Sequence, residues 1–156
     1  METVSFSRLL AAGFLTTSLL LVGCSSSSTS NQVTTNGKCA DEQKISVTDH
    51  ISSQITAFEQ KNWDKAYGYA SNSFQKNINL DDFQAIILDQ YPFLVNNSGY
   101  TFGNCTTNAD GTFQNMTITS KSQSYELIYN LVLEDGELGI FAARVLSAAE
   151  NVAIQF

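Results

Sequence analysis

The hydrophobic pattern of this 156-residue chain changes its period at Pro92. Before Pro92, apolar residues recur every three to four positions, as they do along amphipathic helices, and after it they alternate, as they do along strands with one buried face. Proline cannot continue a helix, because its ring clashes with the preceding turn and its nitrogen carries no proton. Helices followed by a run of strands predict an α+β fold, in which N-terminal helices pack on a curved antiparallel sheet.

Three helices are predicted ahead of Pro92. The first begins at residues 46–49, where Ser-Val-Thr-Asp has the form of a capping box, and it ends near Asn62. A short second helix follows from Trp63. The third begins at Asn79, whose side chain can cap the helix, and Pro92 stops it.

Four strands are predicted after Pro92. Residues 100–107 and 112–120 form the first pair, joined by a turn at 108–111. The second pair consists of a strand from Tyr125 to Leu133 and a return strand over 138–146, and the Asp-Gly dipeptide between them is a strong hairpin signal. Apolar residues also alternate in the tail after Ser147, which predicts an added edge strand or a packed extension.

The first 23 residues have the pattern of an export signal. Arg8 precedes an apolar run that is long enough for the core of a signal peptide but shorter than the roughly 20 residues that a membrane span needs. The run ends in Leu21-Val22-Gly23-Cys24, which resembles the lipobox of bacterial lipoproteins. The resemblance implies that Cys24 is acylated, by chains such as palmitate, and becomes the new N-terminus. We therefore expect a secreted lipoprotein that is anchored to a bacterial membrane and faces outside the cytoplasm.

Residues 24–38 consist mainly of Ser, Thr, Asn and Gln and predict a flexible tether, followed by a single domain over 39–156. The net charge of −7 argues against a nucleic-acid partner, because binding to phosphate rests on cationic side chains. It also argues against electrostatic adhesion to anionic lipid. The expected link to the membrane is therefore the covalent lipid on Cys24.

The chain contains three cysteines. If Cys24 carries the lipid, Cys39 and Cys105 remain as an even pair in a compartment where disulfides persist. Compartment and parity favour a disulfide between them. The alternative is that they are two unrelated small buried residues.

Several apolar segments of the domain carry a resemblance to a known fold. They are Ile51, Ala57-Phe58, residues 66–71, Phe74, Phe83, Tyr91-Pro92, Phe102-Gly103 and the hairpin over 125–146. Together they resemble the nuclear transport factor 2-like superfamily, a cystatin-like, cone-shaped α+β fold, and more closely an uncharacterised bacterial family within it. The resemblance implies a sheet wrapped around a long helix, with a pocket at the open end. It implies no reaction, since the fold hosts enzymes and non-enzymes alike.

The sequence predicts no catalytic residue, no cofactor and no metal site. Proton-transfer enzymes on this fold need an Asp or His base inside the cone, whereas the single histidine, His50, is expected on the polar surface of the first helix. With one histidine and no free cysteine beyond the expected disulfide, a zinc site built from histidine and cysteine is not expected. Asp81 and Asp82 are expected in the first turn of a helix, where acids are favoured by the helix dipole, and so do not indicate a catalytic carboxylate pair. Residues 134–137 lack the ligand spacing of a calcium-binding loop.

One group of residues predicts a pocket. If the Asp-Gly turn is a simple two-residue turn, Arg144 lies opposite Leu127, on the same face as Tyr125 and Tyr129. An arginine and two tyrosines at the end of an apolar face predict a pocket mouth that would select an anionic headgroup. The alternatives are an edge arginine with its head in water, or a register slip that turns Arg144 to solvent.

We therefore expect a non-catalytic binding module for a small amphipathic ligand or a partner protein. The alternatives are an isomerase- or cyclase-like enzyme with a carboxylate base, and a structural envelope protein. The shape and lining of the interior of the cone would distinguish between these three functions. An open cavity with an ionisable residue at its floor favours the enzyme, an open apolar cavity favours ligand binding, and a filled one favours a protein-contact role.

Overall fold

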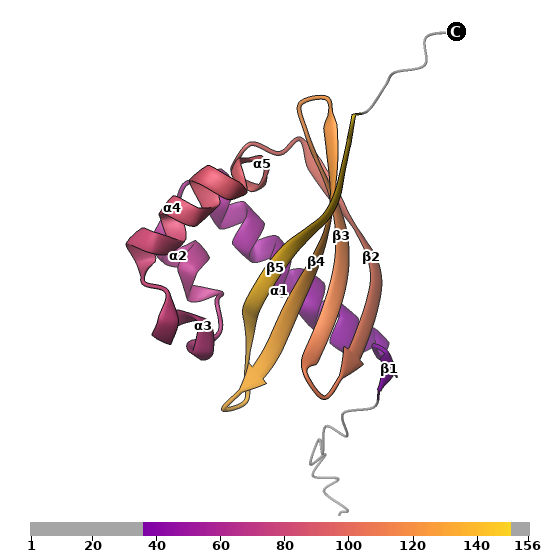
Figure 1. Cartoon of the computed structure of the whole chain (residues 1–156). Helices are drawn as coiled ribbons and strands as arrows, with labels where there is room; N and C mark the ends of the chain where they lie inside the picture. Colours follow the sequence, from indigo (N-terminus) through magenta and orange to yellow (C-terminus); the bar gives the residue numbers. More distant parts are fainter. Residues whose placement is uncertain (1–35, 151–156) are drawn as a thin grey trace, which may run out of the picture. The chain divides into compact units, whose positions relative to one another are not determined.

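The computed structural model describes residues 36–150, so the predicted signal peptide, Cys24 and the chain after residue 150 lie outside the described residues. Within this range five helices precede four long strands, and one open antiparallel sheet has the strand order β1-β2-β3-β4-β5. α1 runs across one face of the curved sheet, and α2, α3 and α4 lie beside β5 (Figure 1). The predicted α+β class is confirmed.

Ordered structure begins before the predicted domain boundary at residue 39. Gly37–Lys38 form β1, which pairs with Thr106 and Thr107 at the far end of β2. Directly after β1, a disulfide joins Cys39 to Cys105, with 5.4 Å between the Cα atoms. The predicted pairing is confirmed, and the last two residues of the predicted tether belong to the sheet.

The first helix, α1, spans Asp41–Glu59 and begins five residues earlier than predicted. Its N-cap is Ala40, which supplies no side-chain hydrogen bond. Two other features stabilise this start: the disulfide at Cys39 holds the preceding residue, and Asp41 and Glu42 place negative charge at the positive end of the helix dipole. The capping-box pattern at residues 46–49 therefore lies inside the helix. The apolar positions of α1 face the core at helical spacing, as predicted: Val47, Ile51, Ile55 and Phe58.

Four shorter helices follow α1 within the described residues. They are α2 (Trp63–Gly68), α3 (Asn72–Asn77), α4 (Leu80–Gln90) and α5 (Pro92–Val95). The cap at Asn79 is confirmed, since its side chain accepts from the backbone N–H of Asp82 at 2.9 Å. Ser71 caps α3 in the same way, and α3 is a short helix that the sequence analysis did not predict. Pro92 follows the end of α4 and is also the first residue of α5, a position whose N–H needs no intrahelical partner.

The long strands extend the predicted ones by a few residues. They are β2 (Gly99–Asn108), β3 (Gly111–Ser120), β4 (Gln123–Glu134) and β5 (Glu137–Glu150). Both predicted turns are confirmed, and β5 continues into the start of the tail as far as residue 150. On β3, every second residue is buried, so one face of the sheet forms the core with α1. Within residues 36–150, no helix is long and apolar enough to cross a membrane.

The loop between α2 and α3 pairs with the outer edge of β5. Ile140 donates its N–H to the Tyr69 carbonyl and accepts from the Ser71 N–H, both at 2.9 Å. This contact requires glycine at position 139, because a Cβ there would lie 2.5 Å from Cα of Ser71. The loop thus ties the small helices to the sheet and covers this part of the β5 edge.

Candidate functional site

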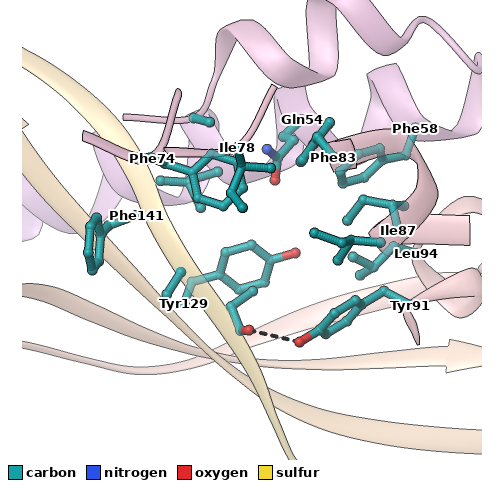
Figure 2. Close-up of a pocket in the computed structure, with 15 residues that line it drawn as sticks. Gln54, Phe58, Phe74, Ile78, Phe83, Ile87, Tyr91, Leu94, Tyr129 and Phe141 are labelled. Atoms are coloured by element: carbon teal, nitrogen blue, oxygen red, sulfur yellow. Dashed lines mark hydrogen bonds between the residues drawn. The ribbon is translucent and has the colours of Figure 1, made fainter. Parts of the chain in front are cut away.

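A cavity of about 210 Å³ lies between the helices and the β4–β5 part of the sheet (Figure 2). Its walls come from α1, α3, α4, the start of α5, β4 and β5. Among the lining residues in the part of the chain that the structure describes, only Gln54, Tyr91 and Tyr129 carry polar side-chain groups. The others are aliphatic or phenylalanine: Phe58, Ala70, Phe74, Ile78, Phe83, Ile86, Ile87, Leu94, Ile140, Phe141, Ala142 and Ala143.

Two of the three polar side chains make hydrogen bonds to the main chain. The Tyr91 hydroxyl donates to the carbonyl oxygen of Ala143 at 3.2 Å, a contact that links the end of α4 to β5 (Figure 2). The Gln54 side chain donates through Nε2 to the Ala66 carbonyl oxygen at 3.1 Å, which links α1 to α2. These bonds orient both side chains at the cavity wall.

The third polar side chain, Tyr129 on β4, is only 1% exposed. Within the described residues, its hydroxyl has no hydrogen-bond partner. Burial raises the pKa of Tyr129 above its ordinary value of 10.0, and the nearby Tyr91 and Tyr100 raise it further, so the hydroxyl keeps its proton at neutral pH. A buried hydroxyl without a partner costs about 1–3 kcal/mol, and such groups are few in native proteins.

The Tyr129 hydroxyl and the Gln54 carboxamide lie on opposite walls of the cavity. Figure 2 shows the Tyr129 ring extending into the cavity from below, while the Gln54 oxygen is directed into it from α1 above. Phe141, which is 44% exposed, stands at the solvent end of the same cavity. The site is therefore an apolar pocket with a neutral donor on one wall and an amide oxygen on the other.

The predicted group of Arg144, Tyr125, Leu127 and Tyr129 does not come together as one pocket. Leu131 pairs with Ile140 as predicted, but Phe141 is then an extra residue, and the register beyond it shifts by one. This β-bulge places Arg144 opposite Ile128, on the exposed face of the sheet. The prediction that Arg144 lines the pocket and selects an anion is therefore wrong.

The other residues of that group have separate surroundings. Tyr125 stacks on Phe93, with ring centroids 4.0 Å apart, and Leu127 is buried in the core. Only Tyr129 lines the cavity. The bulge is also visible in the packing: Ile140 and Val145 both contact the core although they are five residues apart, which an uninterrupted strand cannot achieve.

The sequence analysis did not predict the pocket residues that come from the helices. Gln54, Phe74 and Ile87 lie at helical spacings, which predict residues packed in the core. The local sequence does not distinguish a residue that packs in the core from one that lines a cavity.

His50 lies on α1 outside the pocket, and its Nε2 is 2.9 Å from the carbonyl oxygen of Tyr69. No group of three or more potential metal ligands occurs within residues 36–150. Asp81 and Asp82 lie in the first turn of α4, as predicted.

Comparison with known proteins places the domain in a family. Residues 40–152 match the model of a domain of unknown function, DUF4864. The chain belongs to this family. The match covers nearly all of the described residues, including every element that lines the pocket. No curated protein and no solved structure matches the chain.

Proposed function

We propose that this DUF4864 domain is a binding module that holds a small, mainly apolar ligand in the pocket between α1, α4 and β5. The observation that carries the proposal is the apolar cavity with one unpaired, buried hydroxyl, that of Tyr129. At about 210 Å³ the cavity exceeds the roughly 150 Å³ that admits benzene in an engineered protein, and it is smaller than pockets for drug-sized ligands, which start near 300 Å³. A ligand of about one ring with a short substituent fits this volume.

The lining favours binding over catalysis. A general base works best when its pKa lies near the operating pH, and neither a carboxylate nor an imidazole from the described residues lines the cavity. Tyr129 is the one titratable group at its wall that is fully buried, and burial moves its pKa away from neutrality. The cavity is also open and unfilled, which favours a ligand inside the domain over a partner protein on its surface.

Occluding the cavity tests the proposal. Ala143 lines the pocket from β5, so Ala143→Leu should fill part of it and weaken toluene binding at least tenfold. Ala148→Leu adds the same volume at an exposed position of β5 opposite Tyr125 and serves as the control. Binding can be followed by fluorescence of Trp63, the single tryptophan, whose ring centroid lies 6.2 Å from that of Phe58 at the cavity wall. Equal toluene affinity in both variants, or none in the unaltered protein, would contradict the proposal.

We further propose that the domain is held outside the cytoplasm by a lipid on Cys24. The lipobox-like Leu21-Val22-Gly23-Cys24 supports this, and so does the Cys39–Cys105 disulfide, because such bonds persist in oxidising compartments. Helices on one face of a curved sheet, with a pocket between the two layers, likewise support kinship with the nuclear transport factor 2-like superfamily.

The anchor is tested by the intact mass of the detergent-extracted protein. We expect a mature chain that starts at Cys24 and carries acyl chains, and Cys24→Ser should abolish both the processing and the acyl mass. Ser25→Ala is the control, since it leaves the thiol in place. A mature species that starts elsewhere and carries no acyl mass would refute the anchor without bearing on the pocket.

A further inference from the structure

We propose that the ligand of this pocket is an uncharged compound whose carbonyl oxygen accepts a hydrogen bond from the Tyr129 hydroxyl. This inference rests on the proposed binding function and names the chemistry of the ligand. It follows from three properties of the cavity wall: its unpaired donor, its lack of charge, and its shortage of other polar groups.

The unpaired donor is the first property. The hydroxyl of Tyr91 and the amide of Gln54 each donate to a main-chain carbonyl, whereas the hydroxyl of Tyr129 has no partner within residues 36–150. Tyr129 is fixed on β4 between the buried residues Leu127 and Leu131, so its ring cannot turn away to solvent. Of the three buried side-chain atoms without a partner in residues 36–150, only the Tyr129 hydroxyl belongs to a residue that lines the cavity, and a ligand acceptor there would satisfy it.

The lack of charge is the second property. Among residues 36–150, no lysine, arginine, histidine, aspartate or glutamate lines the cavity. An anionic or cationic ligand would thus lose its hydration without gaining an opposite charge, and this desolvation costs several kcal/mol per ion. Arg144, the cation that the sequence placed here, is exposed on the other face of the sheet. The pocket therefore excludes carboxylates and ammonium groups.

The shortage of polar groups is the third property, and it separates a carbonyl from a hydroxyl or an amine. A carbonyl oxygen accepts from Tyr129 and brings no polar hydrogen of its own. A hydroxyl or amine bound at the same place would bury an additional N–H or O–H beside mainly aliphatic and phenylalanine side chains, because the Gln54 amide oxygen lies on the opposite wall. The carbonyl is thus the acceptor that this wall accommodates at the lowest desolvation cost.

Three probes of similar size test the inference by isothermal titration at pH 7: acetophenone, ethylbenzene and benzoate. Acetophenone carries the carbonyl, ethylbenzene lacks it, and benzoate replaces it with a charge. A net hydrogen bond is worth about 0.5–1.5 kcal/mol, so acetophenone should bind roughly two- to twelvefold more tightly than ethylbenzene. Benzoate should bind more weakly than either neutral probe.

Tyr129→Phe removes the donor and keeps the ring. It should bring the affinity for acetophenone down to that for ethylbenzene and leave ethylbenzene binding unchanged. Tyr125→Phe is the matched control, because Tyr125 lies outside the pocket and its hydroxyl bonds to Gln123 on the surface. In the unaltered protein, a nuclear Overhauser contact between the acetyl methyl of acetophenone and the Tyr129 ring gives a second readout that needs no variant.

The outcomes separate the two proposals. If ethylbenzene binds but acetophenone gains no affinity over it, or if the gain survives in Tyr129→Phe, the assignment of Tyr129 as the donor is overturned and the apolar pocket stands. If benzoate binds best, the exclusion of anions is overturned. If none of the three probes binds the folded protein, the proposed function itself fails.

Discussion

Tyr129 makes the stability of the fold depend on pH in the alkaline range. Its pKa is raised in the folded protein, mainly by burial, whereas the unfolded phenol titrates near 10.0. The stabilisation is therefore complete below pH 10 and is lost as the pH rises above 10, because only the unfolded chain then releases the proton. We expect the free energy of unfolding to fall more steeply above pH 10 in the unaltered protein than in Tyr129→Phe, by up to about 1.4 kcal/mol per pH unit. Urea unfolding between pH 9 and 11 measures both slopes.

Most core substitutions destabilise a protein, but at pH 7 Tyr129→Phe should not lower the free energy of unfolding. Tyr129→Phe removes a buried hydroxyl without a partner, so the unliganded variant should be as stable as the unaltered protein or more stable, by up to about 3 kcal/mol. A marked loss of stability at pH 7 would mean that the hydroxyl has a partner in solution.

Glu134 makes the stability of the fold depend on pH in the acidic range. The side-chain hydroxyl and the backbone N–H of Ser73 donate to its carboxylate, the latter at 2.9 Å, and they lower its pKa below the ordinary 4.5. A lowered pKa in the folded state stabilises the protein above pH 4.5, and this contribution disappears as the pH falls through the folded value. The urea midpoints of the unaltered protein and Glu134→Gln should therefore differ at pH 6, and the difference should shrink as the pH falls below 4.5. Glu137→Gln, which removes a carboxylate from the same hairpin, is the matched control for the change in net charge.

Among the elements, β5 depends on contacts with a loop far away in sequence. Gly139→Ala would place a methyl group 2.5 Å from Cα of Ser71 and push the α2–α3 loop off the strand edge. We expect a loss of about 1–3 kcal/mol, as for overpacking in a core. Gly68→Ala is the matched control, since a Cβ at Gly68 meets nothing within 4 Å. Urea unfolding of both variants decides the question, and equal midpoints would show that the loop contact contributes little.

The bulge at Phe141 explains how the sheet forms one wall of the pocket. The extra residue shifts the register, so that Tyr129 pairs with Ala143 and both line the cavity. Without the bulge, Arg144 would lie on this face and bring a charge into the core. The same irregularity places the large Phe141 side chain at the solvent end of the pocket.

At the scale of the whole molecule, the disulfide joins Cys39, ahead of α1, to β2, the strand that pairs with β1. It connects residues separated by 66 positions, and for a loop of this length the entropy model gives a stabilisation on the order of 4 kcal/mol. The double variant Cys39→Ser/Cys105→Ser should lose stability of this order. Dithiothreitol should lower the urea midpoint of the unaltered protein and leave that of the double variant unchanged. A midpoint insensitive to reductant in both proteins would show that the bond adds nothing.

The local features of this fold were predictable from the sequence, because each depends on neighbouring residues. The cap at Asn79, the end of α4 before Pro92 and the Asp-Gly hairpin all follow from backbone chemistry within a few positions. The order of helices and strands, read from periodicity, then determined the α+β class. The disulfide followed from the parity of the cysteines and the expected compartment.

Only the tertiary structure decided the site. α1 starts at Asp41 without a side-chain cap, since the disulfide and the sheet hold its beginning from outside. The bulge at Phe141 coincides with the loop that pairs with Ile140, a contact between segments about 70 residues apart. The unpaired hydroxyl of Tyr129 depends on every element around it, because a hydrogen-bond partner could come from any of them. Local sequence determines which elements form, whereas the volume and polarity left between them depend on how they pack.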